Sequence, residues 1–266
     1  MNNQFKIMGI LNVTPDSFSD GGDFLDIRNA LLHVEEMIEN GADIIDVGGE
    51  STRPNSEPIT AQEEMRRVIP IISEIHKNFP QITISIDTTK YVVALAALDE
   101  GASIVNDISG LGDDVRIAEL AARFNAGLII MHIQGTPETM QINPHYYNVV
   151  EEVLLHLNSR IELARHSGVQ KIWADVGIGF GKTLEHNLEL LRNLDYFHQL
   201  NVPLALGISR KAFLGKILGI EQPKDRDVPT AIMHSLLLKN NIEILRVHNV
   251  KYLNQLRILN DTMNNI

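Results

Sequence analysis

The feature that most constrains this chain is a unit that recurs along it: a short apolar run that ends on polar residues and is followed by an amphipathic segment. Several of the runs begin at a Gly, the residue favoured immediately after the end of a helix. Eight such runs occur, at 5–12, 41–50, 82–89, 101–110, 126–135, 168–179, 202–209 and 242–249. The repeated unit predicts strands that alternate with helices.

The runs are apolar almost throughout, which is typical of strands with both faces buried in a parallel sheet. Helices are predicted between them, for example at Ile27–Asn40, Ala61–Asn78, Val92–Glu100 and Val149–Ser167. Strands alternating with helices over about 250 residues predict a (β/α)8 TIM barrel, and we expect residues 1–266 to form this single domain. An open doubly wound sheet is the alternative, but no glycine fingerprint follows the first run.

Composition and charge narrow the range of functions. The net charge of −11 argues against a nucleic-acid partner, because a phosphate-binding surface needs clustered Lys and Arg. The absence of Cys excludes disulfides, thiolate zinc sites and a Cys nucleophile. The first apolar run is too short for a signal peptide, and no apolar stretch approaches the ~20 residues of a membrane helix. We therefore expect a cytoplasmic protein without a membrane partner.

The predicted fold indicates where the functional residues should lie, because the active site of a TIM barrel lies at the carboxyl ends of its strands. Every run ends on polar or ionisable residues, which the solvation of strand ends explains only in part. The barrel mouth is therefore predicted to bind a small polar molecule, with Asn12, Asp46, Glu50, Asp87, Asn106, Asp107, His132, Asp175, Ser209, Arg210, Lys211, Arg246 and His248 around it.

Two local motifs extend this prediction. The stretch "DVGIGFGKT" (175–183) matches neither a Walker loop nor a dinucleotide fingerprint, yet its glycines let the backbone approach a ligand; a plain flexible loop is the alternative. Arg246 and His248 are two apart and so share a face of their strand, where an inward Arg and His favour an anion such as phosphate. No metal-ligand spacing accompanies His132, so a dedicated zinc site is not expected.

Long polar segments follow the first two strands. "VTPDSFSDGG" (13–22) and "GGESTRPNSEP" (48–58) predict long flexible loops at the mouth of the barrel, although the second also reads as an ordinary surface loop. We expect the first to act as a mobile lid over the site that excludes water from it.

Taken together, these segments resemble the dihydropteroate synthase family of folate biosynthesis across essentially the whole chain. The matching stretches are "MGILNVTPDSFSDGG", "DIIDVGGESTRP", "ISIDTTK", "IVNDISG", "MHIQGTPETMQ", "DVGIGFGK", "GISRK" and "ILRVHNV". The resemblance implies a transferase that uses Mg²⁺ and joins 6-hydroxymethyl-7,8-dihydropterin pyrophosphate to p-aminobenzoate, giving 7,8-dihydropteroate and pyrophosphate. It also implies a homodimer and a sulfonamide target.

The resemblance further implies roles for single residues. The pterin ligands would be Asp87, Asn106, Asp175 and Lys211. The pyrophosphate ligands would be Asn12, Arg246 and His248, with Asn12 acting through Mg²⁺ as the metal ligand. The p-aminobenzoate pocket would contain Thr52, Arg53, Pro54 and Phe180 beside Lys211.

The resemblance also implies an order of steps, in which pyrophosphate departs before the amine attacks. Asp20 would stabilise the pterin-methylene cation left behind. The residues expected to take part in catalysis are Asn12, Asp20, Lys211, Arg246 and His248.

The chain departs from the family pattern at several positions. Ala212 stands where many members carry Ser, and "DRDVPTA" (225–231) stands where the family usually shows Gly-Thr or Gly-Ser. Val176, Ile178 and Asn249 replace Pro, Phe and Asp. These departures keep open the alternative of a non-catalytic pterin-binding paralogue. A further alternative is a pterin-dependent methyl transfer module, which the first loop disfavours.

Overall fold

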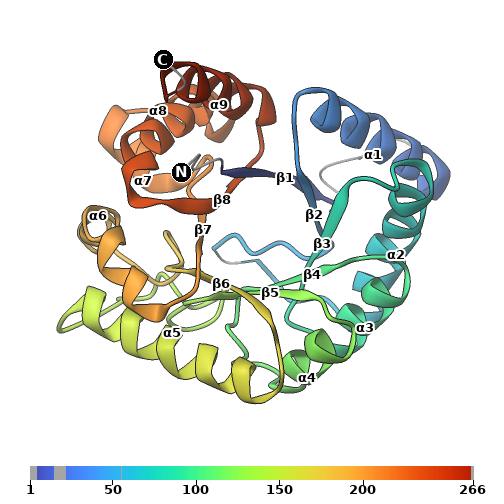
Figure 1. The fold of residues 1–266 in the computed structure, drawn as a ribbon, viewed down its shortest axis with the longest axis horizontal. Helices are drawn as coiled ribbons and strands as arrows, with labels where there is room; N and C mark the ends of the chain where they lie inside the picture. The colour runs from blue at the N-terminus through green and yellow to red at the C-terminus, as the bar shows by residue number, and fades with distance from the viewer. Residues whose placement is uncertain (1–4, 15–21, 55, 265–266) are drawn as a thin grey trace.

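The computed structural model describes residues 5–14, 22–54 and 56–264. Within them, parallel strands form a closed barrel in which each strand pairs with the next along the chain and β8 pairs with β1. Helices surround this ring (Figure 1). The strands are β1 (Lys6–Asn12), β2 (Ile44–Gly48), β3 (Thr83–Asp87), β4 (Ile104–Asp107), β5 (Gly127–Met131), β6 (Lys171–Asp175), β7 (Leu204–Gly207) and β8 (Ile242–Val247). The predicted (β/α)8 barrel is thereby confirmed, while the extent of the domain, 1–266, stays a prediction.

The helices lie between successive strands and after the last one. They are α1 (Gly22–Glu39), α2 (Ala61–Asn78), α3 (Tyr91–Asp99), α4 (Arg116–Arg123), α5 (Val149–His166), α6 (Leu184–Arg192), α7 (Ala212–Leu218), α8 (Asp227–Leu237) and α9 (Val250–Asn264), with short 3-10 helices η2 (Leu194–Leu200), η3 (Pro223–Arg226) and η4 (Leu238–Asn240).

Side-chain caps explain two helix starts that the sequence predicted to the residue. Thr60 accepts a hydrogen bond from the backbone N–H of Glu63 at the start of α2, and Asn148 does the same for Glu151 at the start of α5. The first helix differs from the prediction, since α1 begins at Gly22 and not at Ile27.

The interior of the barrel holds an apolar layer below the candidate site. Every strand except β3 contributes one buried apolar side chain to it, and β3 contributes the buried hydroxyl of Ser85. The apolar members are Met8, Ile44, Ile104, Ile129, Trp173, Ala205 and Ile244. This layer forms the floor beneath the carboxyl ends of the strands.

The next inward-facing layer is where the polar residues gather. Successive side chains of a strand point to opposite faces, so the residue two positions after each floor residue also points inward. These residues are Ile10, Asp46, Asp87, Asn106, Met131, Asp175, Gly207 and Arg246. Because every second side chain of a strand points inward, the polar layer lies directly above the apolar one.

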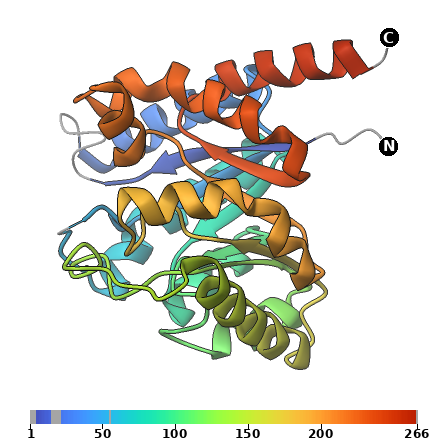
Figure 2. The ribbon, with the colours of Figure 1, turned by 90° about the vertical axis from the view of Figure 1, so that its left-hand side faces the viewer.

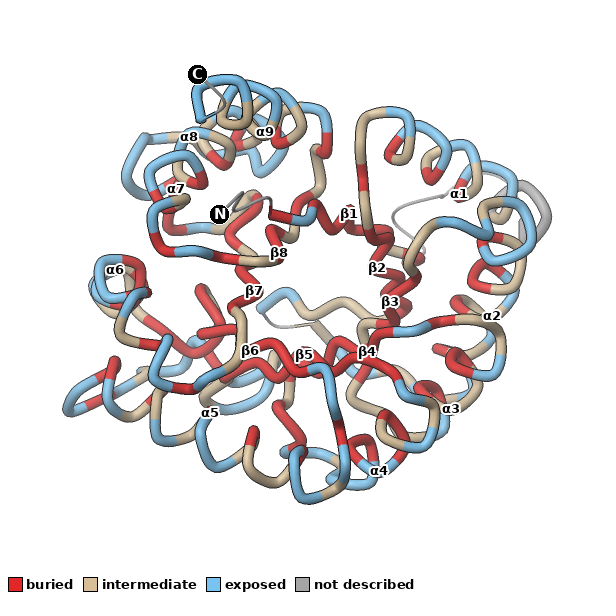
Figure 3. The backbone as a smooth tube through the Cα atoms, in the orientation of Figure 1, coloured by how far each residue is buried: buried red, intermediate tan, exposed pale blue. Residues whose placement is uncertain are grey.

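The outward faces of the strands form the main core together with the helices. Side chains such as Ile45, Ile86 and Val105 are fully buried there, against helix residues such as Val68 and Ile71. Figure 3 shows the ring of strands buried almost throughout, while the outer sides of the helices are exposed. Among the residues that the structure describes, no helix is both long and apolar enough to cross a membrane.

The connections that leave the carboxyl ends of the strands lie together at one end of the barrel, and α9 ends at the opposite side (Figure 2). The connection between β2 and α2 is long, as predicted. The connection between β5 and α5, residues 132–148, is longer still, and the sequence reading did not single it out.

Candidate active site

An ion-pair cluster centred on Arg246 occupies the polar layer. Arg246 donates from Nε to Asp46 Oδ2 at 2.5 Å and from Nη2 to Asp87 Oδ2 at 2.6 Å. Asn106 donates to the same Asp46 oxygen at 3.1 Å. Residues from β2, β3, β4 and β8 thus meet at one place, as the barrel prediction requires. The Nη1 of Arg246 has no partner among the described residues and is available to a phosphate oxygen.

Burial changes the proton affinity of this cluster. Desolvation raises the pKa of Asp87 to about 7, with Arg246 opposing the shift and the neighbouring Asp46 adding to it. Desolvation acts against the charge of Arg246, but the carboxylates of Asp46 and Asp87 outweigh it and raise the pKa of the guanidinium. Arg246 therefore stays charged, whereas Asp87 lies close to its titration point at neutral pH.

A second group of predicted residues surrounds Lys211, the N-cap residue of α7. Its ammonium lies 3.7 Å from the centroid of the Phe180 ring, within the range of a cation–π contact. Burial lowers the pKa of Lys211 to about 7, while Asp175 opposes that shift. Asp175 accepts a hydrogen bond from the backbone N–H of Gly177 at 2.8 Å, and its pKa is raised by burial. The arrangement offers a carboxylate, an amine and an aromatic face side by side.

Glycines keep the space around these groups open. A Cβ at Gly207, on β7, would lie 3.8 Å from Asp175 Oδ2 and 3.9 Å from Arg246, between the two groups of polar residues. Gly179 has a φ of +83°, and a Cβ there would approach Lys211 Cδ to 3.1 Å. A side chain at either position would narrow the mouth, so the backbone itself forms part of its wall.

His248 lies immediately after β8, as a half-buried residue beside the Arg246 cluster. The Ser209 hydroxyl accepts the backbone N–H of His248 at 3.1 Å and lies 3.0 Å from its Nδ1. Burial, with the charges of Arg210 and Arg246, lowers the pKa of His248 to about 3. The neutral ring can accept the Ser209 hydrogen at Nδ1, which leaves an N–H at Nε2 to donate to an anion.

Two of the strand-end carboxylates predicted at the mouth fix loops instead. Glu50 accepts from Lys90 at 2.7 Å and from the backbone N–H of Ile59 at 2.7 Å, which closes the connection after β2. Asp107 accepts from the backbone N–H and hydroxyl of Ser109 and from the backbone N–H of Leu111. Both carboxylates satisfy backbone N–H donors of the connections that follow their strands. Glu50 also lines the cavity between the connections after β2, β3, β4 and β5.

Two basic strand-end residues also turn away from the mouth. Arg210 makes a bidentate pair with Asp227, at 2.6 and 2.9 Å, and Asn249 donates to the same carboxylate at 3.1 Å. The charge of Arg210 is therefore balanced by a carboxylate of this chain. His132 lies against the buried Lys182 and not in the mouth.

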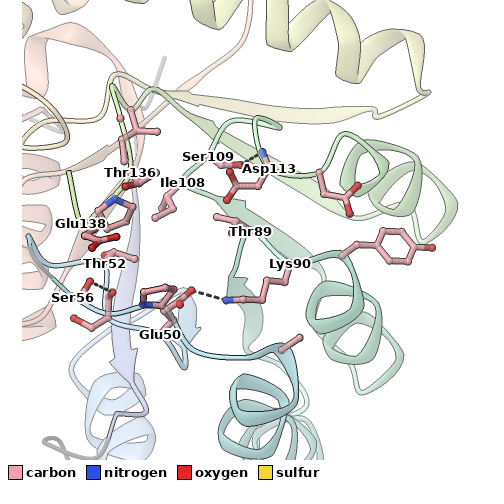
Figure 4. A pocket seen from close by; sticks show the side chains of 18 of the residues that line it. Glu50, Thr52, Ser56, Thr89, Lys90, Ile108, Ser109, Asp113, Thr136 and Glu138 are labelled. Atoms are coloured by element: carbon pink, nitrogen blue, oxygen red, sulfur yellow. Dashed lines mark hydrogen bonds and ion pairs between the residues drawn. The ribbon is translucent and has the colours of Figure 1, made fainter. Parts of the chain in front are cut away.

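The predicted p-aminobenzoate residues fall into two groups. Thr52 lines a cavity of about 560 Å³ between the connections that follow β2, β3, β4 and β5 (Figure 4). Ile108 and Ile133 also line it, but Phe180 and Lys211 do not. Arg53 and Pro54 are exposed. The structure thus pairs Phe180 with Lys211 and leaves the residues after β2 at the rim.

The predicted metal ligand lies at the end of β1. Asn12 is half-buried, and its amide has no hydrogen-bond partner among the described residues. Within the same residues, no cluster of three or more acidic or histidine side chains could hold a metal by itself. An amide oxygen suits Mg²⁺, which in proteins keeps several waters and takes few protein ligands. The predicted acid of the first loop, Asp20, lies outside the described residues.

Sequence reasoning missed one organising residue of the site. Asp46 was noted as a strand end but received no role, yet it holds both Arg246 and Asn106 and is completely buried. Asp46 follows the floor residue Ile44 by two positions and therefore also points inward, and this spacing is the signal in the sequence that could have identified it. Lys182 was quoted only as part of a motif.

Comparison with known proteins agrees with this geometry. A family model described as "pterin binding enzyme" matches residues 8–248. The dihydropteroate synthase of Clostridium beijerinckii is 46% identical over 248 residues, which are 92% of this chain and 88% of that protein.

Solved structures of dihydropteroate synthases share the fold. The Yersinia pestis structure, a sulfonamide drug complex, superimposes with a TM-score of 0.92 at 34% identity, covering 100% of this chain and 97% of that one. The Clostridium difficile structure, determined in the presence of pteroic acid, gives a TM-score of 0.90 at 42% identity, covering 98% and 97%.

Proposed function

The chain belongs to the pterin-binding enzyme family, as a dihydropteroate synthase, and from this premise we propose which residues carry its reaction. The enzyme is a transferase that joins 6-hydroxymethyl-7,8-dihydropterin pyrophosphate to p-aminobenzoate and releases pyrophosphate. The observation that carries the proposal is the polar layer, in which residues from β2, β3, β4, β6 and β8 converge above an apolar floor.

The pterin is assigned to Asp87, Asn106, Asp175 and Lys211. The aminopyrimidinone edge of a pterin presents adjacent N–H donors that a carboxylate accepts together, and Asp175 provides a buried carboxylate for them. Acceptors on the ring are served by the amide of Asn106 and by Lys211. Asp46 orients Asn106 through its 3.1 Å hydrogen bond and so fixes which way this amide points.

The pyrophosphate is assigned to Asn12, Arg246 and His248. Arg246 offers the unpartnered Nη1, and His248 offers its Nε2–H. Asn12 would hold Mg²⁺ through its amide oxygen. When bound, Mg²⁺ supplies positive charge that neutralises the leaving group. Arg246 and His248 direct the departing anion toward β8, where their hydrogen bonds strengthen as charge develops on it.

The p-aminobenzoate is assigned to the side of the mouth at Phe180 and Lys211, with Thr52, Arg53 and Pro54 at its rim. Its neutral amine attacks the pterin-methylene carbon after pyrophosphate has left, and the amine loses a proton as the C–N bond forms. A neutral aromatic amine is already nucleophilic, so no strong base is needed. Asp20 keeps its proposed role of stabilising the cation.

One assay tests this proposal. The purified chain is mixed with the dihydropterin pyrophosphate and Mg²⁺, and pyrophosphate release is followed with and without p-aminobenzoate. We expect release that depends on p-aminobenzoate, with a matching amount of 7,8-dihydropteroate detected by mass. Omission of Mg²⁺ with a chelator tests the metal separately. Dihydropteroate formation that survives chelation would exclude the Mg²⁺ assignment and leave the synthase activity standing.

We also propose that the chain forms a homodimer through α8, in the cytoplasm. Val228, Ile232 and Leu236 are 49%, 56% and 64% exposed and lie four residues apart on one face of α8. Ile217 and Leu218 of α7 are exposed as well. A row of exposed apolar side chains along one helix face favours an interface.

A charge on this surface tests the dimer. Ile232→Glu is expected to halve the mass measured by sedimentation, because it would bury a carboxylate in the interface. Leu155→Glu is the matched control, since Leu155 is 66% exposed on the distant α5. A wild-type chain that sediments as a monomer, or an unchanged mass in Ile232→Glu, contradicts the assignment. Competition of a sulfonamide with p-aminobenzoate in the same preparation tests the predicted drug target.

A further inference from the structure

Lys182 is a buried cation that the assigned roles do not use. It follows β6 in the connection to α6, and only 3% of it is exposed. Its ammonium meets three neutral acceptors: Nδ1 of His132 at 2.9 Å, the Phe180 carbonyl at 2.9 Å and the His132 carbonyl at 3.4 Å. No ion pair joins it to a carboxylate in the described part of the chain. Burial lowers the pKa of Lys182 to about 7, while the charge of Asp175 opposes that shift. Burial of this amine is costly, and its hydrogen bonds offset the cost.

The contacts of Lys182 join two backbone segments, one after β5 and one after β6, that pass very close to one another. A Cβ at Gly177 would lie 1.8 Å from the His132 carbonyl oxygen, and one at Gly181 would lie 2.3 Å from the Gln134 carbonyl oxygen. The ammonium therefore sits where carbonyl groups after β5 and after β6 converge. It donates to two of these buried carbonyls, those of His132 and Phe180.

The hydrogen bond to Phe180 links Lys182 to the substrate side of the site. Phe180 is 7% exposed, and its ring supports the Lys211 ammonium at 3.7 Å. Gln141 of the 132–148 connection donates to the Gly179 carbonyl at 2.9 Å, and Tyr146 donates to the Gly181 carbonyl at 2.9 Å. Gln141 and Tyr146 thus hold the carbonyls on either side of Phe180. Among the described residues, Lys182 is the side chain that donates to the carbonyl of Phe180 itself.

We propose that Lys182 is a positioning residue that holds the Phe180 ring, and through it Lys211, at the p-aminobenzoate side of the mouth. It does not touch either substrate. The inference rests on the proposed assignment of Phe180 to the p-aminobenzoate pocket. It adds that the 132–148 connection and the loop after β6 act as one unit, with the ammonium of Lys182 as its central donor.

The proposal predicts different effects on the binding of p-aminobenzoate and on the binding of the pterin. Lys182→Met keeps the length and apolar bulk of the stem but removes the donors. Misplacement of a binding group by about 1 Å can cost on the order of 100-fold. We therefore expect the KM for p-aminobenzoate to rise by about tenfold to 100-fold. The dissociation constant for the pterin, measured by fluorescence without p-aminobenzoate, should change by less than about threefold, because Asp175, Asn106 and Asp87 keep their positions.

A double-mutant cycle shows whether the effect passes through Phe180. Phe180→Ala removes the ring, so adding Lys182→Met to it should cost much less than Lys182→Met costs in the wild type. Lys182→Gln, which retains N–H donors, should recover part of the loss and serves as the working variant if Lys182→Met does not fold. Circular dichroism and melting temperature are measured for each variant.

Each result of these experiments either supports or overturns the positioning role of Lys182. An unchanged KM for p-aminobenzoate in Lys182→Met, an equal loss of pterin affinity, or additive effects with Phe180→Ala would each overturn the positioning role. Failure of the proposed function is a different result, because the wild-type chain itself would then release no pyrophosphate in response to p-aminobenzoate.

Discussion

At the scale of single residues, the site is decided by which polar groups face one another. Asp46, Asp87 and Arg246 come from strands far apart in the sequence, and their hydrogen bonds of 2.5 and 2.6 Å exist only because the barrel closes. Asp175 differs from Asp87 in having no cation within hydrogen-bond distance in the described part of the chain. Its carboxylate meets the backbone N–H of Gly177, and its second oxygen remains for a ligand.

Asp175 is therefore expected to dominate pterin binding. Asp175→Asn removes the charge of the acceptor and should raise the dissociation constant for the pterin by about 10- to 100-fold. This change corresponds to the roughly 1.5–3 kcal/mol of a charge-assisted hydrogen bond. Ala212→Ser adds a hydroxyl at an exposed position and should change turnover by only about twofold. Titration of pterin fluorescence and initial rates measure the two effects. Pterin binding that survives Asp175→Asn would remove this carboxylate from the site.

Asp87 gives a prediction about pH. Its pKa in the folded chain is raised from 3.8 to about 7, mainly by burial. Protonated Asp87 contributes fully to the stability of the folded chain at pH values below the pKa that this carboxyl has in the unfolded chain. The contribution is lost as the pH rises through about 7, because the unfolded chain releases the proton at a lower pH than the folded chain does. In Asp87→Asn the free energy of unfolding should thus depend less on pH between 4 and 7 than in the wild type. Urea unfolding at intervals across this range measures the difference, and parallel curves would contradict the raised pKa.

At the scale of helices and strands, polar residues at strand ends serve two purposes that the sequence does not distinguish. Asp46 and Asp87 face the mouth, while Glu50 and Asp107 hold the loops that follow their strands. Asp87 and Asp107 are the last residues of β3 and β4, whereas Asp46 lies two residues before the end of β2 and Glu50 two residues after it. Which purpose each serves depends on whether its side chain points inward or lies just past the last inward position, where the backbone turns.

Helix α8 carries a buried histidine whose removal should stabilise the chain. His234 is fully buried, and neither of its ring nitrogens has a hydrogen-bond partner in the described structure. An unsatisfied buried polar group costs about 1–3 kcal/mol, so His234→Leu should raise the free energy of unfolding by about that amount if the site accommodates the new shape. Thermal unfolding at neutral pH measures this gain.

The same substitution should change behaviour in acid. Burial lowers the pKa of His234 from 6.5 to about 3, so the wild type loses stability as the pH falls below 6.5, because only the unfolded chain takes up the proton there. His234→Leu should reduce that loss, whereas His166→Leu, at an exposed position of α5, should not. Equal acid sensitivity in all three chains would show that His234 is accessible to protons.

At the scale of the whole molecule, closure of the barrel depends on contacts between the two ends of the chain. β8 pairs with β1, and Arg257 of α9 donates to Asp43 Oδ2 at 2.6 Å and to the Gly41 carbonyl at 2.7 Å. Asp43 also accepts the backbone N–H of Ile7 at 2.7 Å. The last helix is thereby fastened to the turn that precedes β2.

Arg257→Met should weaken this closure. The side chain is 15% exposed and makes charge-assisted hydrogen bonds, so its removal is expected to cost about 1.5–3 kcal/mol of unfolding free energy. Lys77→Met breaks an exposed pair, with the lysine 74% exposed, and should cost less than about 1 kcal/mol. Denaturant titration of the two variants compares them directly. Equal costs would mean that the terminal helix does not contribute to closure.

The amino-acid sequence alone predicts the barrel, the order of its strands and most of the residues that converge at its mouth. It could do so because alternation of apolar runs with helices has few packed solutions, and strand ends in a barrel meet on one side. The tertiary structure decided what the period alone left open: that Asp46 holds Arg246 and Asn106, that Glu50, Asp107 and Arg210 serve loops, and that Lys182 supports Phe180. These contacts join residues distant along the chain, and their distances and burial are set by packing between elements, which no local pattern encodes.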